Sequence, residues 1–173
     1  MFSRTENFQQ YIKFYPVVST IIALNVIIHV LTMVPVLGDL IFNYGAGANY
    51  LISDGQWWRF ITPMFLHSGF LHLLFNMFSL YLFGPELEKL AGKLRFLNIY
   101  FMAGLFGTVA TFLLQDASYV HVGASGAIYG LLGAFGALVY YARKTLPQLR
   151  QIILPIIVIS IIMTFLTPNI NAT

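Results

Sequence analysis

Five long apolar runs constrain the fold of this chain more than any other feature of its sequence. They cover residues 17–36, 69–83, 96–114, 123–141 and 152–166. A helix needs about 20 apolar residues to cross the roughly 30 Å hydrocarbon core of a bilayer, so each run is a candidate span. With 58% hydrophobic and only 9% charged residues, the 173-residue chain cannot form a water-soluble surface. We therefore expect an all-α, polytopic membrane bundle that forms one domain over residues 1–173.

Basic residues lie almost entirely in connections that fall on one side of this predicted bundle. Consecutive connections alternate sides, so the N-terminal tail shares a side with residues 84–95 and 142–151. These segments hold eight of the nine Lys and Arg residues, and only Arg59 lies opposite, in the long first loop. The positive-inside rule makes the basic side, with the N-terminus, cytoplasmic. The net charge of +3 thus reflects membrane topology and predicts no nucleic-acid partner.

The first loop, residues 37–68, is unusual because it carries many aromatic side chains and few charges. Trp57, Trp58, Phe60 and Phe65 all lie within it. Aromatic side chains concentrate where the hydrocarbon of a bilayer meets water. We expect this loop to lie in the interface or the outer leaflet rather than in bulk water.

Three polar residues fall at one depth, near the outer ends of two predicted spans. His72 and Asn76 are four residues apart in the second span, which places them on one helical face. Ser125 opens the fourth span within Gly123-Ala124-Ser125-Gly126. Ionisable and amide groups inside spans are costly in hydrocarbon and are candidates for function. Their shared depth indicates a site suited to acyl transfer.

The surroundings of Ser125 favour the same chemistry. Gly123 and Gly126 allow a tight backbone, and a helix N-terminus offers free N–H groups and a positive dipole. These donors, with His72 and Asn76, could stabilise an oxyanion that develops on a carbonyl attacked by Ser125. The competing interpretation is packing, because small residues such as Gly126 commonly allow membrane helices to approach closely.

Two further histidines, His67 and His121, lie near the predicted site, but we expect neither to take part in catalysis. His67 precedes the second span and is expected to be a rim residue near an opening to water. His121 precedes Ser125 by four residues and is expected to be a solvated loop side chain, although a base at that position is conceivable.

Taken together, Gly123-Ala124-Ser125-Gly126, His72-x-x-x-Asn76 and Trp58-Arg59 resemble the signature set of the rhomboid family of intramembrane serine proteases. The resemblance implies a six-helix core, of which five spans are present here. It also implies a serine-histidine dyad that needs no metal and no other cofactor. The expected partners are transmembrane protein substrates within the lipid bilayer.

The resemblance also assigns roles residue by residue. Ser125 would be the nucleophile, and His72 and Asn76 would line the oxyanion hole. Five other positions would support them: Gly123 and Gly126 in the serine motif, Tyr129 against the catalytic histidine, and Trp58-Arg59 as the anchor of the first loop. Glu88 resembles a glutamate that ties helices together by hydrogen bonds, and the alternative for Glu88 is a solvated cytoplasmic charge.

One departure from the family pattern concerns the catalytic base, which the family carries in a sixth span. The sequence ends at Thr173, where that helix would begin, and the expected histidine is absent. We therefore expect a C-terminally incomplete domain that is inactive in this form, in which Gly126 and Gly130 would lose a helix that covers them. The alternatives are a catalytically dead rhomboid-like protein that binds transmembrane clients, or a small transporter. Short loops favour a prokaryotic plasma membrane.

Overall fold

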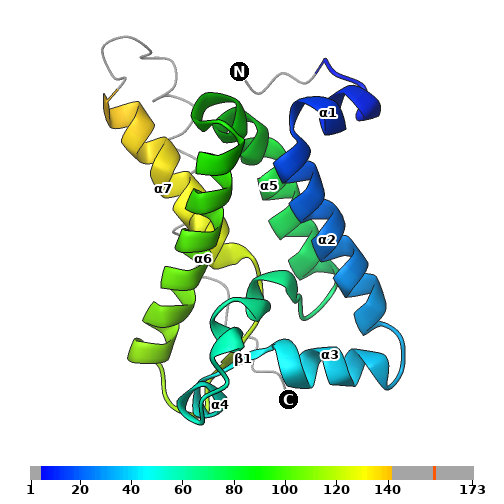
Figure 1. Cartoon of the computed structure of the whole chain (residues 1–173), viewed down its shortest axis with the longest axis vertical. Helices are drawn as coiled ribbons and strands as arrows, with labels where there is room; N and C mark the ends of the chain where they lie inside the picture. Colours follow the sequence, from blue (N-terminus) through cyan, green and yellow to red (C-terminus); the bar gives the residue numbers. More distant parts are fainter. Residues whose placement is uncertain (1–4, 142–157, 159–173) are drawn as a thin grey trace.

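The computed structural model describes residues 5–141 and 158, and its main elements are helices (Figure 1). Four helices form the body of the bundle. They are α2 (Pro16–Thr32), α5 (Phe70–Ala91), α6 (Lys93–Leu114) and α7 (Ser125–Tyr141). Helices α5 and α6 are each long and apolar enough to cross a membrane, and α1 (Phe8–Phe14) and α2 qualify together as a pair bent by 112°. The predicted all-α membrane bundle is confirmed, and the fifth predicted span, 152–166, lies outside the described residues.

The N-terminal tail forms a helix that the sequence analysis did not predict. Helix α1 begins with a capping box, in which the Asn7 side chain accepts from the Gln10 backbone and the Gln10 side chain accepts from the Asn7 backbone. Each bond satisfies an N–H group that a helix start leaves without a partner. The chain then bends at Tyr15, and Pro16 starts α2 at the first helical position, where its missing N–H costs nothing.

Helix α5 is longer than the predicted second span, which was wrongly expected to end at residue 83. The helix continues through Pro85 to Ala91, and the connection predicted over 84–95 is reduced to Gly92. Packing against α2 explains why the proline does not end the helix. A side chain at Gly84 would come within 2.7 Å of Val18, so the two helices approach closely there. Contacts beyond the proline outweigh its local tendency to break a helix.

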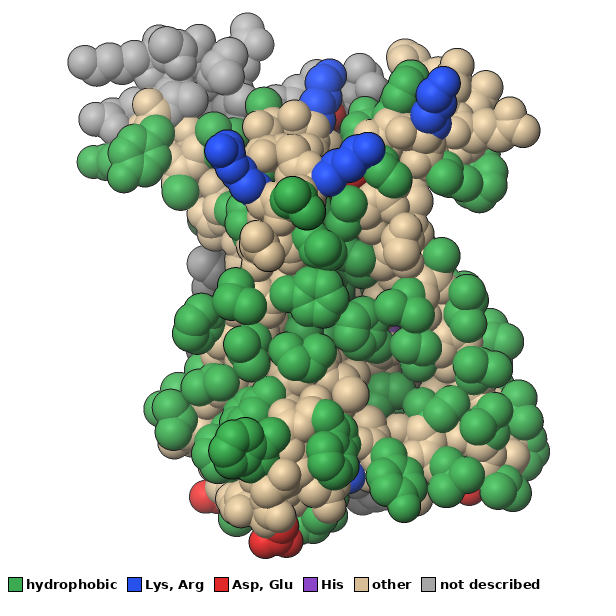
Figure 2. Space-filling view, viewed as in Figure 1, with side chains coloured by type: hydrophobic (Ala, Val, Ile, Leu, Met, Phe, Trp, Pro, Cys, Tyr) green, Lys and Arg blue, Asp and Glu red, His purple; other side chains and the backbone are tan. Residues whose placement is uncertain are grey.

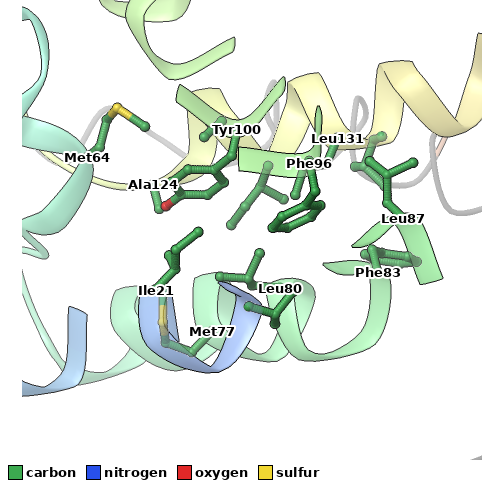
Figure 3. Close-up of a cluster of buried hydrophobic side chains, with 14 of the residues drawn as sticks. Ile21, Met64, Met77, Leu80, Phe83, Leu87, Phe96, Tyr100, Ala124 and Leu131 are labelled. Carbon is green, nitrogen blue, oxygen red and sulfur yellow. The ribbon is translucent and has the colours of Figure 1, made fainter. Parts of the chain in front are cut away.

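A continuous apolar core lies between the four body helices, and Figure 3 shows its side chains converging from α2, α5, α6 and α7. Phe96, Tyr100, Leu80 and Leu131 are among its fully buried members. Ala124, the residue before Ser125, is also completely buried in this cluster. The start of α7 is therefore held by the core on one side while the serine itself is exposed.

The charged side chains separate to the two ends of the bundle. Figure 2 shows Lys and Arg side chains at the end where α1 and the junction of α5 and α6 lie, above a broad apolar belt. Lys13, Lys89 and Lys93 belong to these elements and are exposed. Exposed Asp54 and Asp116 lie in connections at the other end. The basic residues that the structure describes, apart from Arg59, thus share one end, as the topology argument requires.

The first loop folds into short elements at the end opposite α1. They are α3 (Leu37–Gly45), β1 (Gly47–Ala48), α4 (Asn49–Ser53) and the 3-10 helices η1 (Trp57–Phe60) and η2 (Thr62–Phe65). Helix α3 lies crosswise to α2 in Figure 1. Strand β1 pairs antiparallel with β2 (Val120–His121), a short connection that the all-α prediction did not include. Trp57 and Trp58 remain exposed, which suits a segment at the membrane interface.

Candidate active site

Ser125 is the first residue of α7 and is exposed. The turn before it depends on Gly123, whose φ of 125° lies in a region that side-chain-bearing residues rarely adopt. The Gly123 N–H donates to the carbonyl of Pro63 at 2.8 Å, which ties this turn to η2. Ser125 therefore sits at the positive end of a 17-residue helix, on a backbone fixed from two directions.

His72 reaches the same turn from α5. Its Nδ1 lies 3.1 Å from the Ser68 hydroxyl, which orients the ring. A Cβ at Gly123 would lie 2.7 Å from His72 Nε2 and 3.8 Å from Ser125 Oγ, so both atoms border one small space beside this glycine. When the Ser68 hydroxyl donates to Nδ1, Nε2 carries the proton and presents a donor to that space. A developing oxyanion there would meet a donor within reach.

Asn76 lies one turn further along α5 and is buried. Its Nδ2 donates to the backbone carbonyl of His72 at 2.8 Å. The amide thus supports the part of the helix that carries His72. The structure brings His72 to the Ser125 turn directly, whereas the Asn76 amide donates within its own helix.

A cavity of about 240 Å³ opens beside Ser125 between α6, α7 and η2. Gly123, Gly126 and Tyr129 line it together with the serine, which places four of the predicted site residues around one space. Within the part of the chain that the structure describes, the lining does not include His72 or Asn76. The remaining walls come from Met64, Gly104, Gly107, Thr108, Thr111, Tyr119, His121, Val122 and Ala127.

The polar walls of this cavity were not identified as site residues from sequence. Thr108 and Thr111 donate to the carbonyls of Gly104 and Gly107, at 3.2 and 3.0 Å, within α6. Polar residues that share one helical face of a predicted span are candidates for function, as argued for His72 and Asn76. Two threonines three residues apart meet this criterion, because residues i and i+3 share a helical face.

His121 corrects a second expectation, because it is not a solvated loop residue. Its ring is half-buried, lines the cavity and stacks on Tyr119 with ring centroids 6.1 Å apart. Burial lowers the pKa of His121. No sequence pattern indicated this burial, because it results from the pairing of β2 with β1.

Gly126 and Gly130 face α6 within the part of the chain that the structure describes, and the expectation that a sixth span also covers them stays a prediction. A Cβ at Gly126 would lie 3.7 Å from the Cα of Gly107, and one at Gly130 would overlap Ala103. The two helices therefore approach at nearly backbone contact, as small residues permit in membranes. The predicted close-packing role of these glycines is confirmed, but α6 is the partner.

Trp58 and Arg59 hold the first loop together. Arg59 is only 2% exposed, and its guanidinium donates to the carbonyls of Ala46 and Asn43 and to the side chain of Gln56. The Trp58 indole donates to the Tyr44 carbonyl at 2.9 Å. Charge-assisted donors of this kind fix a loop more strongly than neutral ones.

Glu88 lies near the basic end of the bundle, away from Ser125. It is 3% exposed, and its two carboxylate oxygens accept from the backbone N–H groups of Val17 and Val18, at 3.2 and 2.9 Å. These are unpaired donors in the first turn of α2, where a negative charge also meets the positive end of the helix dipole. Glu88 thus links α5 to α2.

Comparison with known proteins shows the family of this chain. The profile of the Rhomboid domain matches residues 54–173. YdcA of Bacillus subtilis is 41% identical over 173 residues, which cover 99% of this chain and 87% of that protein. The chain belongs to the rhomboid family. Rhomboid protease GluP, also from Bacillus subtilis, is 42% identical over 129 residues, covering 74% of this chain and 25% of GluP. RHOMBOID-like protein 5 of Arabidopsis thaliana is 44% identical over 91 residues, covering 52% of this chain and 29% of that protein.

Proposed function

We propose that this membrane protein is a serine endopeptidase that cleaves transmembrane segments, with Ser125 as its nucleophile. The observation that carries the proposal is that the Ser125 hydroxyl and the His72 ring both border the space beside Gly123, at the N-terminus of α7 and the edge of a cavity. Membership of a family that includes Rhomboid protease GluP supports the same reaction.

The proposed reaction passes through an acyl-enzyme. Ser125 Oγ bonds to the carbonyl carbon of the scissile peptide as a general base removes its proton, and the carbonyl oxygen becomes an oxyanion. N–H groups at the start of α7 and the His72 side chain stabilise this charge, with the Asn76 amide as a further donor. The tetrahedral intermediate collapses, the C–N bond breaks, and the base returns the proton to the leaving amine. Water then hydrolyses the ester by the same steps.

The base in this proposal is the histidine that the family resemblance assigns to a sixth span, which completes a serine-histidine dyad. Residues 1–173 contain no histidine after His121. A neutral serine without a base is a weak nucleophile. We therefore expect a polypeptide limited to these 173 residues to cleave nothing, and a form that includes the sixth span to be active.

The proposed setting is a prokaryotic plasma membrane with the N-terminus in the cytoplasm. The placement of the described Lys and Arg side chains, apart from Arg59, at one end of the bundle supports this orientation. Ser125 then lies toward the outer end of the bundle, and the proposed substrates are proteins whose transmembrane helix enters the site from the bilayer.

A second candidate is a rhomboid-like protein without catalysis that binds transmembrane clients. The presence of Ser125 beside His72 opposes it, because client binding alone requires neither group.

One experiment separates the two functions. The protein encoded by the full gene is reconstituted with a transmembrane reporter, beside its Ser125→Ala variant and a polypeptide of residues 1–173. The protease proposal expects cleavage by the first protein only. Binding of the reporter without cleavage by any of the three would support the client-binding alternative, and cleavage by Ser125→Ala would refute the assigned nucleophile.

A further inference from the structure

The segment that leads into Ser125 is attached along its length to the first loop. In the pairing of β1 with β2, Gly47 lies opposite His121 and Ala48 opposite Val120. The connection continues beyond the strands, because the Asn49 N–H donates to the Tyr119 carbonyl at 3.1 Å and the Asn49 side chain donates to the Asp116 carbonyl at 3.0 Å. The backbone of residues 116–121 therefore follows the position of the first loop.

One side-chain contact sets how closely these two segments approach. The His121 ring lies directly over Gly47, where a Cβ would come within 2.6 Å of Nε2 and 2.9 Å of Nδ1. Real Cβ atoms essentially never lie so close to another heavy atom, so a side chain at position 47 would force the imidazole to shift. Gly47 is buried, and Tyr119 stacks on the His121 ring. The ring is thus enclosed between β1 and Tyr119.

The first loop is itself a firm support for this contact. Arg59 donates to the carbonyl of Ala46, the residue before Gly47, and Thr62 donates to the carbonyl of Gly45 at 2.8 Å. The same loop holds the far end of the serine segment, because Gly123 donates to Pro63. Residues 121–123 are therefore fixed at both ends by one unit, residues 45–63.

The position of this segment determines where Ser125 lies. His121 and Ser125 line the same cavity, and only three residues separate them. A displacement of His121 moves Gly123 and with it the N–H groups and hydroxyl at the start of α7. Misplacement of a reacting group by about 1 Å can cost roughly 100-fold in rate.

We propose that His121 is a positioning residue for Ser125, and that its ring, seated on Gly47, sets the geometry of the turn at residues 121–125. The inference rests on the proposed protease function and deepens it. His121 acts through the backbone, and it neither accepts the serine proton nor contacts the scissile bond. Its contribution is expected in turnover rather than in the affinity for a substrate helix.

The contact between Gly47 and His121 permits a double-substitution test. The encoded protein is assayed for reporter cleavage beside Gly47→Ala, His121→Ala and the double variant. Gly47→Ala introduces a methyl group that overlaps the imidazole, and we expect kcat to fall about 100-fold with little change in KM. His121→Ala loosens the turn, with an expected loss of about 10-fold. In the double variant the methyl group occupies space that the ring vacated, so activity should return to the level of His121→Ala.

His121→Phe distinguishes positioning from proton transfer, because phenylalanine keeps a planar ring and cannot act as a base. Activity at or above that of His121→Ala supports positioning, whereas activity reduced to that of Ser125→Ala would assign His121 a chemical role. Thermal unfolding of every variant identifies any that fail to fold.

The outcomes also separate this inference from the proposed function. If the unsubstituted protein does not cleave, or Ser125→Ala still does, the proposed function fails. If Ser125-dependent cleavage is present, two results overturn the positioning role: full turnover by His121→Ala, or an equal cost of Gly47→Ala with and without the His121 ring.

Discussion

Replacement of Glu88 by glutamine should destabilise the bundle without removing any apolar contact. The carboxylate accepts from two backbone donors of α2, the buried Val18 N–H and the partly buried Val17 N–H. A hydrogen bond to a charged group contributes about 1.5–3 kcal/mol. Glutamine keeps one acceptor oxygen and directs an NH₂ group at the other donor, and it also loses the charge at the helix N-terminus. We expect a loss of about 2 kcal/mol, or roughly 30-fold in the unfolding equilibrium constant.

Unfolding in detergent, followed by circular dichroism as SDS is added, measures this loss. Glu88→Ala should cost more, about 4 kcal/mol, because both donors lose their partner at roughly 1–3 kcal/mol each. Asp54→Asn is the matched control, since it removes a carboxylate charge from an exposed position. A Glu88→Gln variant as stable as Asp54→Asn would refute the argument that this carboxylate joins α5 to α2.

Three further predictions follow from topology, oxyanion stabilisation and burial. In this cysteine-free chain, a single cysteine at Asp116 should be labelled from outside intact cells and one at Lys93 should not, and the reverse pattern would overturn the orientation. His72→Ala and Asn76→Ala should each lower kcat about 100- to 1000-fold with little change in KM, measured by reporter cleavage, whereas unchanged turnover would leave both residues a packing role. Burial, and to a smaller extent the neighbouring histidines, lowers the pKa of His67 to about 3 in the folded protein. Below the ordinary pKa of 6.5, the His67 side chain is therefore protonated in the unfolded chain but not in the folded protein. The free energy of unfolding should therefore fall by about 2 kcal/mol between pH 7.5 and pH 5. In His67→Phe, detergent unfolding at the two pH values should show a fall that is smaller by this amount.

Hydrophobic length and helical spacing were enough to predict much of this fold. The four body helices that the structure describes were predicted from their apolar runs, and α5, α6 and the bent pair α1 and α2 are long and apolar enough to cross a membrane. His72 and Ser125 were placed at one depth because each lies near the outer end of a predicted span. These inferences depend on periodicity and on the thickness of a bilayer, which act locally along the chain.

The features that sequence reasoning missed depend on contacts between distant segments. Helix α5 continues through Pro85 because α2 packs against it, which local propensity cannot indicate. His121 is half-buried because two-residue strands from different loops meet. Gly126 was correctly expected to pack closely, but spacing alone could not show that its partner is Gly107 of α6.

Reaction with a serine-directed fluorophosphonate tests the central claim most directly. The protein encoded by the full gene is treated in mild detergent, digested and examined by mass spectrometry to locate the adduct. We expect a single adduct on Ser125, lost in Ser125→Ala and absent from a polypeptide of residues 1–173, which lacks the family's base histidine to activate the hydroxyl. An encoded protein that cleaves the reporter but carries its adduct on another residue, or carries none, would contradict Ser125 as the nucleophile.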